Sequence, residues 1–120
     1  MKLTNQKAFD KIYKYFIFKK NKRSISDNGY CRYRAGELKC AVGVLIPDDD
    51  YDSDMEGSHC RTVRHNYFEE EWKDLNMDLL SELQRVHDTS GEWSKKGVLL
   101  KAPIKRIAQK YKLTIPKEPK

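Results

Sequence analysis

Three cysteines and three histidines carry the most versatile chemistry in this sequence: Cys31, Cys40, His59, Cys60, His65 and His87. Thiolate and imidazole groups bind zinc when four of them converge, and structural zinc sites usually draw their ligands from tight pairs such as C-x2-4-C. Cys31 and Cys40 are instead separated by eight residues, which suits a cross-strand pair, and the neighbours His59 and Cys60 would point apart. The spacing favours buried thiols over a zinc site. Zinc stays an open alternative, and no metal ligand is predicted.

Cys40 and His87 form a second candidate arrangement, a thiol nucleophile with its general base. Small residues after Cys40 would leave backbone N–H groups free to stabilise an oxyanion, and Glu56 or a nearby aspartate would orient the imidazole. Asp88 is not expected to do so, because adjacent helical residues point about 100° apart. A histidine beside apolar residues is more often a core residue, so a cysteine-dependent hydrolase or transferase is kept only as an alternative function.

The acidic segment between Asp48 and Glu56 invites comparison with a calcium loop. Asp52, Asp54, Glu56 and Gly57 fit the first ligand positions of an EF-hand, but position 12 is then Val63 instead of a bidentate glutamate. The sequence therefore predicts a solvated acidic loop. A weakly held divalent cation remains an alternative, and no cofactor is predicted.

Composition limits the architecture that can position these side chains. The 120 residues include 38% hydrophobic residues, enough for one modest core, and no apolar run approaches the ~18 residues of a membrane span. The first residues lack the apolar region of a signal peptide. We expect one soluble, cytoplasmic domain over residues 1–115 with a frayed tail over 116–120, and no membrane contact.

The net charge of +6 is divided into opposed blocks. Residues 1–30 carry +6, residues 31–92 carry −8 and residues 93–120 carry +8. Two oppositely charged surfaces favour steering and specificity toward a protein partner.

Residues 5–20 carry the stripe of an amphipathic helix: Phe9, Ile12, Tyr13, Phe16 and Ile17. Thr4 is the expected N-cap, and Lys7, Lys11 and Lys14 share another face. A polar loop over 22–29 should lead to a β-hairpin in which Arg34 faces Glu37 across an Ala-Gly turn. A three-residue turn that shifts the register by one is the alternative.

A closely packed buried strand or helix start is expected over 41–46, ended by Pro47. A loop should follow over 48–66, with regular structure resuming at Tyr67 or later. Apolar spacing predicts a helix over 76–88 and a last helix starting with Pro103 at its first position. Lys105 and Arg106 line the outer side of this last helix.

The lysines of both terminal helices, with Arg32 and Arg34 near tyrosines, also support a nucleic-acid interface as an alternative. No RNA- or DNA-binding motif is readable, however, and most aromatics occupy core positions. Lysines along an amphipathic helix usually form only a solvated face, so nucleic acid ranks below a protein partner.

The middle of the chain resembles a set of small, uncharacterised proteins from bacteriophages and bacteria. The resemblance is carried by Cys-x-Tyr-Arg from Cys31, Lys-Cys-Ala-x-Gly-x-Leu-Ile-x-Asp from Lys39, Met-Glu-Gly from Met55 and Leu-Gln-x-x-His-Asp from Leu83. It covers roughly residues 7–113. It implies a phage-type accessory protein that binds a host macromolecule, in host takeover or against a defence system, and it implies that these motifs form one unit.

The expected fold is a small α+β domain with three or four helices around a short hairpin. In this fold Arg34 would form a bidentate pair with Asp48 or Glu56 and hold the acidic loop across the hairpin. Scaffolding is the favoured role of this clamp, and a clamp that lines a pocket is the alternative. The predicted binding residues are Lys7, Lys11, Lys14, Arg32, Arg34, Asp48, Glu56, Lys105 and Arg106. The sequence does not determine the oligomeric state.

Overall fold

A computed structural model describes residues 2–26 and 32–118. Its α-helices are α1 (Asn5–Tyr13), α2 (Ala41–Leu45), α3 (Cys60–Tyr67), α4 (Met77–Asp88) and α5 (Lys101–Lys110), and its strands are β1 (Arg34–Ala35) and β2 (Leu38–Lys39). A π-helix, η1 (Lys14–Phe18), continues α1, and three 3-10 turns are η2 (Asp48–Asp50), η3 (Ser53–Met55) and η4 (Ser90–Glu92). The chain therefore has the small α+β fold expected from the sequence.

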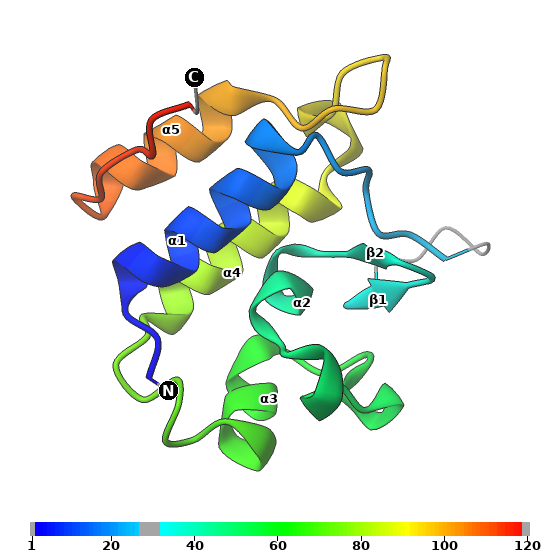
Figure 1. Cartoon of the computed structure of the whole chain (residues 1–120), viewed down its shortest axis with the longest axis vertical. Coiled ribbons are helices and arrows are strands. Elements are labelled where there is room, and N and C mark those ends of the chain that lie inside the picture. Colours follow the sequence, from blue (N-terminus) through cyan, green and yellow to red (C-terminus); the bar gives the residue numbers. More distant parts are fainter. Residues whose placement is uncertain (1, 27–31, 119–120) are drawn as a thin grey trace.

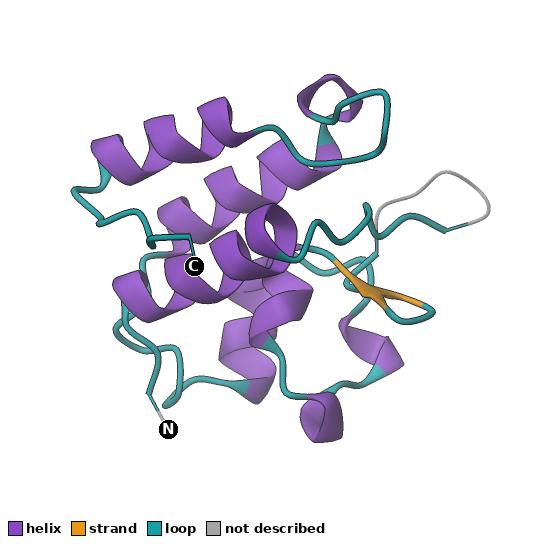
Figure 2. Ribbon diagram, turned by 45° about the horizontal axis from the view of Figure 1, so that its top comes forward, coloured by secondary structure: helices purple, strands orange, loops and turns teal. Residues whose placement is uncertain are grey.

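The helices form a bundle with the hairpin at its edge (Figures 1 and 2). Helix α4 contacts α2, α3 and α5, and α1 packs on α2. Leu79, Leu80 and Leu83 of α4 are at most 1% exposed because they face this shared core. No helix among the described residues is long and apolar enough to cross a membrane.

The first helix forms where its apolar stripe predicts it. The Thr4 hydroxyl caps it by accepting from the Lys7 N–H at 3.1 Å. After Tyr13 the helix widens into η1, which keeps Phe16 and Ile17 buried and ends at Phe18. Tyr15, in this widened turn, reaches the hairpin, where its hydroxyl accepts from the Lys39 N–H at 3.0 Å.

The hairpin register differs from both predicted registers. Arg34 pairs with Lys39 and Ala35 with Leu38, so Gly36 and Glu37 form the turn. Gly36 has φ +62°, whereas Glu37 does not enter the positive region. A positive φ at the first central position alone is the requirement of a type II′ turn, and glycine meets it without strain. The expected pairing of Cys31 with Cys40 lies outside the described residues.

The buried segment after the hairpin is the short helix α2. The Cys40 thiol caps it by accepting from the Gly43 N–H at 3.3 Å. A Cβ at Gly43 would lie 2.2 Å from the Tyr33 carbonyl oxygen, so only glycine allows this helix to approach the hairpin so closely.

The prediction of an irregular segment over 48–66 is wrong. This segment contains η2, η3 and most of α3, which begins at Cys60. Only Cys60 and Val63 of α3 are buried, and the cap is the His59 ring, which accepts from the Arg61 N–H at 3.1 Å. Two apolar positions and an unusual cap leave a weak helix signal in the sequence.

The last two long helices agree more closely with the predictions. The Asn76 side chain caps α4 at the expected start, and α4 ends at Asp88. Helix α5 begins at Lys101, two residues before the predicted start, because Pro103 fits within the first turn, where its missing N–H is not needed. After α5, the Thr114 backbone exchanges hydrogen bonds of 2.8 and 2.9 Å with the Gln6 side chain.

We predict that Gly43→Ala destabilises the protein by about 3 kcal/mol, because the new methyl group would overlap a backbone carbonyl that cannot move aside. Urea unfolding followed by circular dichroism measures this change. Gly91→Ala is the control, since a Cβ there meets no atom within 4 Å, and its effect should stay within about 0.5 kcal/mol. Equal stability of the two variants would contradict the assigned contact.

Candidate functional site

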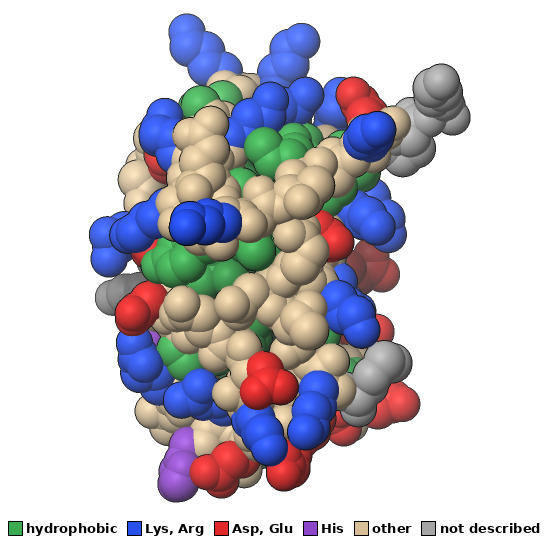
Figure 3. Space-filling view, turned by 90° about the vertical axis from the view of Figure 1, so that its left-hand side faces the viewer, with side chains coloured by type: hydrophobic (Ala, Val, Ile, Leu, Met, Phe, Trp, Pro, Cys, Tyr) green, Lys and Arg blue, Asp and Glu red, His purple; other side chains and the backbone are tan. Residues whose placement is uncertain are grey.

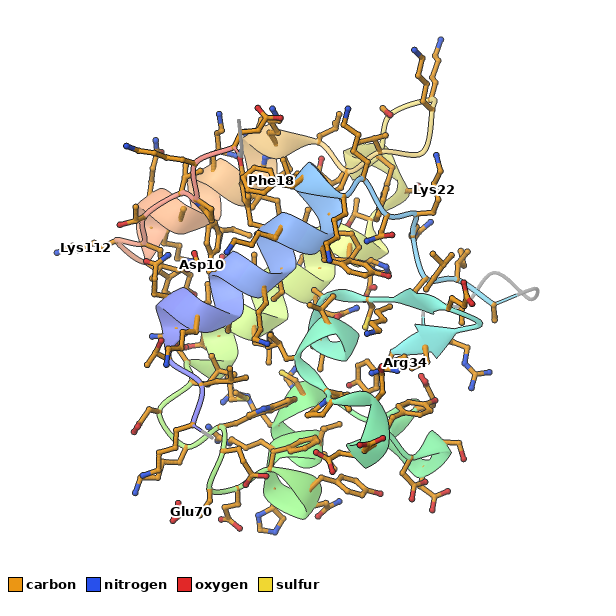
Figure 4. The ribbon with its side chains drawn as sticks, viewed as in Figure 1. Asp10, Phe18, Lys22, Arg34, Glu70 and Lys112 are labelled. Atoms are coloured by element: carbon orange, nitrogen blue, oxygen red, sulfur yellow. The ribbon has the colours of Figure 1, made fainter. Side chains whose placement is uncertain are left out.

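The expected clamp between the hairpin and the acidic segment is present with a different geometry. Arg34 Nη1 donates to Asp48 Oδ1 at 2.7 Å, whereas Nη2 donates to the Ile46 carbonyl at 2.6 Å (Figure 4). The pair is therefore not bidentate on one carboxylate. Arg34 and then Lys39, whose Nζ lies 3.3 Å away, hold the pKa of the Asp48 carboxyl below its usual value.

Glu56 makes the more extensive connection. Its Oε1 accepts from the Tyr33 N–H at 2.9 Å and its Oε2 from the Arg34 N–H at 3.1 Å. The Tyr51 hydroxyl also donates to Oε2, at 2.6 Å. Burial and this bond raise the pKa of Tyr51. One carboxylate therefore ties the start of the hairpin to the segment between η3 and α3.

His87 is fully buried and both of its ring nitrogens are engaged. Nε2 accepts from the Ser24 N–H at 3.0 Å, so in the neutral ring the proton is on Nδ1, which lies 2.8 Å from Asp88 Oδ1. The expectation that Asp88 would not orient His87 is therefore wrong. Asp88 is the last residue of α4, and the Gln84 amide holds its carboxylate from one turn earlier, at 2.7 Å.

Cys40 and His87 do not form a nucleophile and base pair. The Cys40 thiol is fully buried and accepts from Gly43, and desolvation raises its pKa to about 12. Neither nitrogen of His87 is bonded to it, since Ser24 and Asp88 occupy them. The structure gives a reaction at Cys40 no support.

Described residues from each of the four motifs quoted for the resemblance line one cleft of about 540 Å³. Arg32 and Tyr33 come from the hairpin, residues 56–60 from the start of α3, Val42 from α2, and four side chains from α4, namely Ser81, Gln84, Arg85 and Asp88. The clamp at Glu56 thus also lines a pocket.

Sequence reasoning missed several residues of this cleft. Gln84 joins three segments, because its Oε1 accepts from the Val42 N–H at 2.9 Å while its Nε2 donates to Asp88. The i, i+4 spacing of Gln84 and Asp88 is the signal that would have indicated this pair.

Another wall of the cleft brings together His59, Cys60 and Ser81. The Cys60 sulfur lies 3.5 Å from Ser81 Oγ, and that oxygen lies 3.3 Å from His59 Nε2. No signal in the sequence brings Ser81 to them.

The predicted basic residues of the terminal helices lie elsewhere, on α1, η1 and α5. Lys7, Lys11, Lys14, Lys105 and Arg106 are exposed, and none forms an ion pair within the described part of the chain. The one pair at α5 joins Lys110 to Glu82 at 3.0 Å. These side chains are separate from the cleft, whose lining includes only Arg32 and Glu56 of the predicted binding residues.

Among residues 2–26 and 32–118, no three His, Cys, Asp or Glu side chains are grouped closely enough to hold a metal ion. Cys31 lies outside this range. Comparison of the chain with known protein families, with curated proteins and with solved structures gives no match.

We predict that the Cys40 thiol reacts with a maleimide only when the protein opens, because at pH 8 roughly one Cys40 thiol in ten thousand is ionised. A variant with Cys31 and Cys60 replaced by serine isolates this thiol. Its labelling should be at least about a hundredfold slower than in urea, and its pH dependence should be that of an exposed thiol, levelling off above a pH of about 8.5. Labelling of the folded protein at the rate of free cysteine would contradict this assignment.

We further predict that Glu56→Gln lowers the free energy of unfolding by about 2 kcal/mol, because an amide cannot accept from both the Tyr33 and the Arg34 N–H groups. Thermal unfolding measures this loss. Glu37→Gln is the matched control, since Glu37 is an exposed residue of the hairpin turn, and it should change stability by no more than about 0.5 kcal/mol. The assignment fails if both variants unfold at the same temperature.

Proposed function

We propose that this chain is a non-enzymatic accessory protein that docks onto another protein through its charged ends. The observation that carries this proposal is the separation of the two signs of charge across one fold. Lys and Arg dominate the upper end of the face in Figure 3, whereas Asp and Glu are concentrated toward the lower end, where Lys and Arg side chains lie among them. In Figure 4, Lys22 and Lys112 project at the end that holds α5, and Glu70 lies at the opposite end, beyond α3.

The acidic end is not neutralised by the basic helices. Asp48 pairs with Arg34 and Lys39 of the hairpin, while Lys105 and Arg106 of α5 form no ion pair with any described residue. Both charged ends therefore remain available to a partner. A charge distribution of this kind raises association rates and selects partners of complementary pattern.

The shape beside the α1 lysines favours a protein over a nucleic acid. Lys7 and Lys11 border a groove of about 290 Å³ whose other lining residues include Leu45, Phe68 and Trp72. Asp50 and Glu71 lie on the same groove, where they would repel phosphates. Among the described residues, the exposed large hydrophobic side chains are Ile25, Tyr67 and Leu100, so exposed rings for base stacking are not concentrated at the basic end. The resemblance to small phage proteins makes a bacterial host protein the proposed partner.

We expect the tagged protein to capture a host protein from a nuclease-treated bacterial lysate, and Lys105→Glu with Arg106→Glu to slow that association about tenfold at low salt. Biolayer interferometry with the purified partner measures the rate. The control is Arg64→Glu with Lys73→Glu, which changes the net charge equally but makes the acidic end more acidic, and it should not slow the association.

Two results would contradict the proposal. Equal slowing by both variants would show an effect of net charge alone. Binding that disappears with nuclease treatment and reappears as a salt-dependent gel shift with RNA or DNA would favour the nucleic-acid alternative instead.

A further inference from the structure

The cleft between the hairpin, α3 and α4 is a second feature, independent of the charged ends. Its volume of about 540 Å³ falls within the range of small-molecule pockets, roughly 300 to 1,000 Å³. Bonds described above fix its walls, since Glu56 ties the hairpin to the start of α3 and Gln84 ties α2 to α4. The walls of the cleft are therefore fixed relative to one another before any ligand arrives.

The carboxylates of the cleft are already supplied with donors. Glu56 accepts from two backbone N–H groups and from Tyr51, and only 15% of its side chain is exposed. Asp88 accepts from His87 and from Gln84. Neither carboxylate needs a cation from a ligand.

The two arginine side chains of the cleft make fewer hydrogen bonds and ion pairs than its carboxylates do. Arg85 is exposed, and although its backbone carbonyl accepts from the Thr89 hydroxyl at 2.7 Å, its guanidinium makes no hydrogen bond or ion pair with any residue in the described ranges. Its neighbour Glu82 is occupied by Lys110 and Tyr111. Arg32 forms an ion pair with Glu56, with 3.9 Å between Nε and Oε1, and its side chain also interacts with Tyr51, but 44% of the Arg32 side chain is exposed. Each guanidinium carries five N–H donors, so donor capacity exceeds acceptor capacity on these walls.

Other polar groups and an apolar surface complete the cleft. His59 Nδ1 accepts from the Arg61 N–H, which places the proton of the neutral ring on Nε2, 3.3 Å from Ser81 Oγ. Ser58 and Ser81 contribute hydroxyl groups, and Tyr33, Val42 and Cys60 provide apolar surface deeper in the cleft.

We propose that this cleft binds a small organic molecule through a phosphate or carboxylate group that Arg85 and Arg32 hold. Guanidinium groups form paired, charge-assisted hydrogen bonds with both oxyanions. The volume exceeds that of an isolated oxyanion, so the rest of the ligand packs against the apolar wall.

Amide and arginine side-chain NMR signals of the full chain, followed during separate titrations with inorganic phosphate and with citrate, test this proposal. Sodium chloride keeps the ionic strength constant and provides the reference titration. We expect saturable shifts at Gly57, Cys60 and the Arg85 side chain. Saturation with phosphate alone assigns a phosphate ester, and saturation with citrate assigns a carboxylate.

Arg85→Gln and, separately, Arg32→Gln should each weaken this binding on the order of tenfold. Arg64→Gln is the matched control, because Arg64 lies on α3 outside the cleft lining, and it should bind as the unchanged protein does. The spectrum of each variant also reports whether its fold is intact. Shifts that rise linearly without saturating, or affinities equal in all variants, would overturn the proposal.

Discussion

The fold depends on how a two-stranded hairpin, too small to be stable alone, is attached to a helical bundle. Glu56 supplies the attachment on one side by accepting the backbone N–H groups of Tyr33 and Arg34. Gly43 supplies it on the other side by letting α2 approach the Tyr33 carbonyl without a side chain between them. The bonds on either side of Tyr33 therefore determine the position of the hairpin, and with it one wall of the cleft.

The polar residues around this attachment have two roles: they hold segments of the chain together, and several of them also line the cleft. His87, buried and held by Ser24 and Asp88, joins the segment after η1 to the end of α4. Gln84 extends the same network to α2. Because these internal bonds satisfy the carboxylates and the imidazole, the groups left to meet a ligand are mainly arginine donors. This is why the chemistry of the cleft suits the binding of an oxyanion better than catalysis.

The charged side chains at the surface act over longer distances than these hydrogen bonds. The acidic segment is fastened to the hairpin by Arg34 and Lys39, so the lysines of α5 are not drawn onto it. One end of the structure is thus mainly basic, while the acidic side chains gather toward the other end with basic side chains among them (Figures 3 and 4). Binding through such ends would be steered by electrostatics and weakened by salt.

The sequence by itself determined the class of fold, α1 with its Thr4 cap, and α4, because long apolar stripes and capping side chains act locally. The grouping of the Cys-Tyr-Arg, Met-Glu-Gly and His-Asp motifs was implied only by the resemblance and stays a prediction. Only the tertiary structure decided the hairpin register, helix α3, the engagement of His87 by Asp88 and the place of Arg85 in the cleft. Each of these depends on contacts between residues far apart in the chain or, for α3, on too few apolar positions to predict a helix. The burial of Cys40 likewise follows from the packing of α2 against its neighbours.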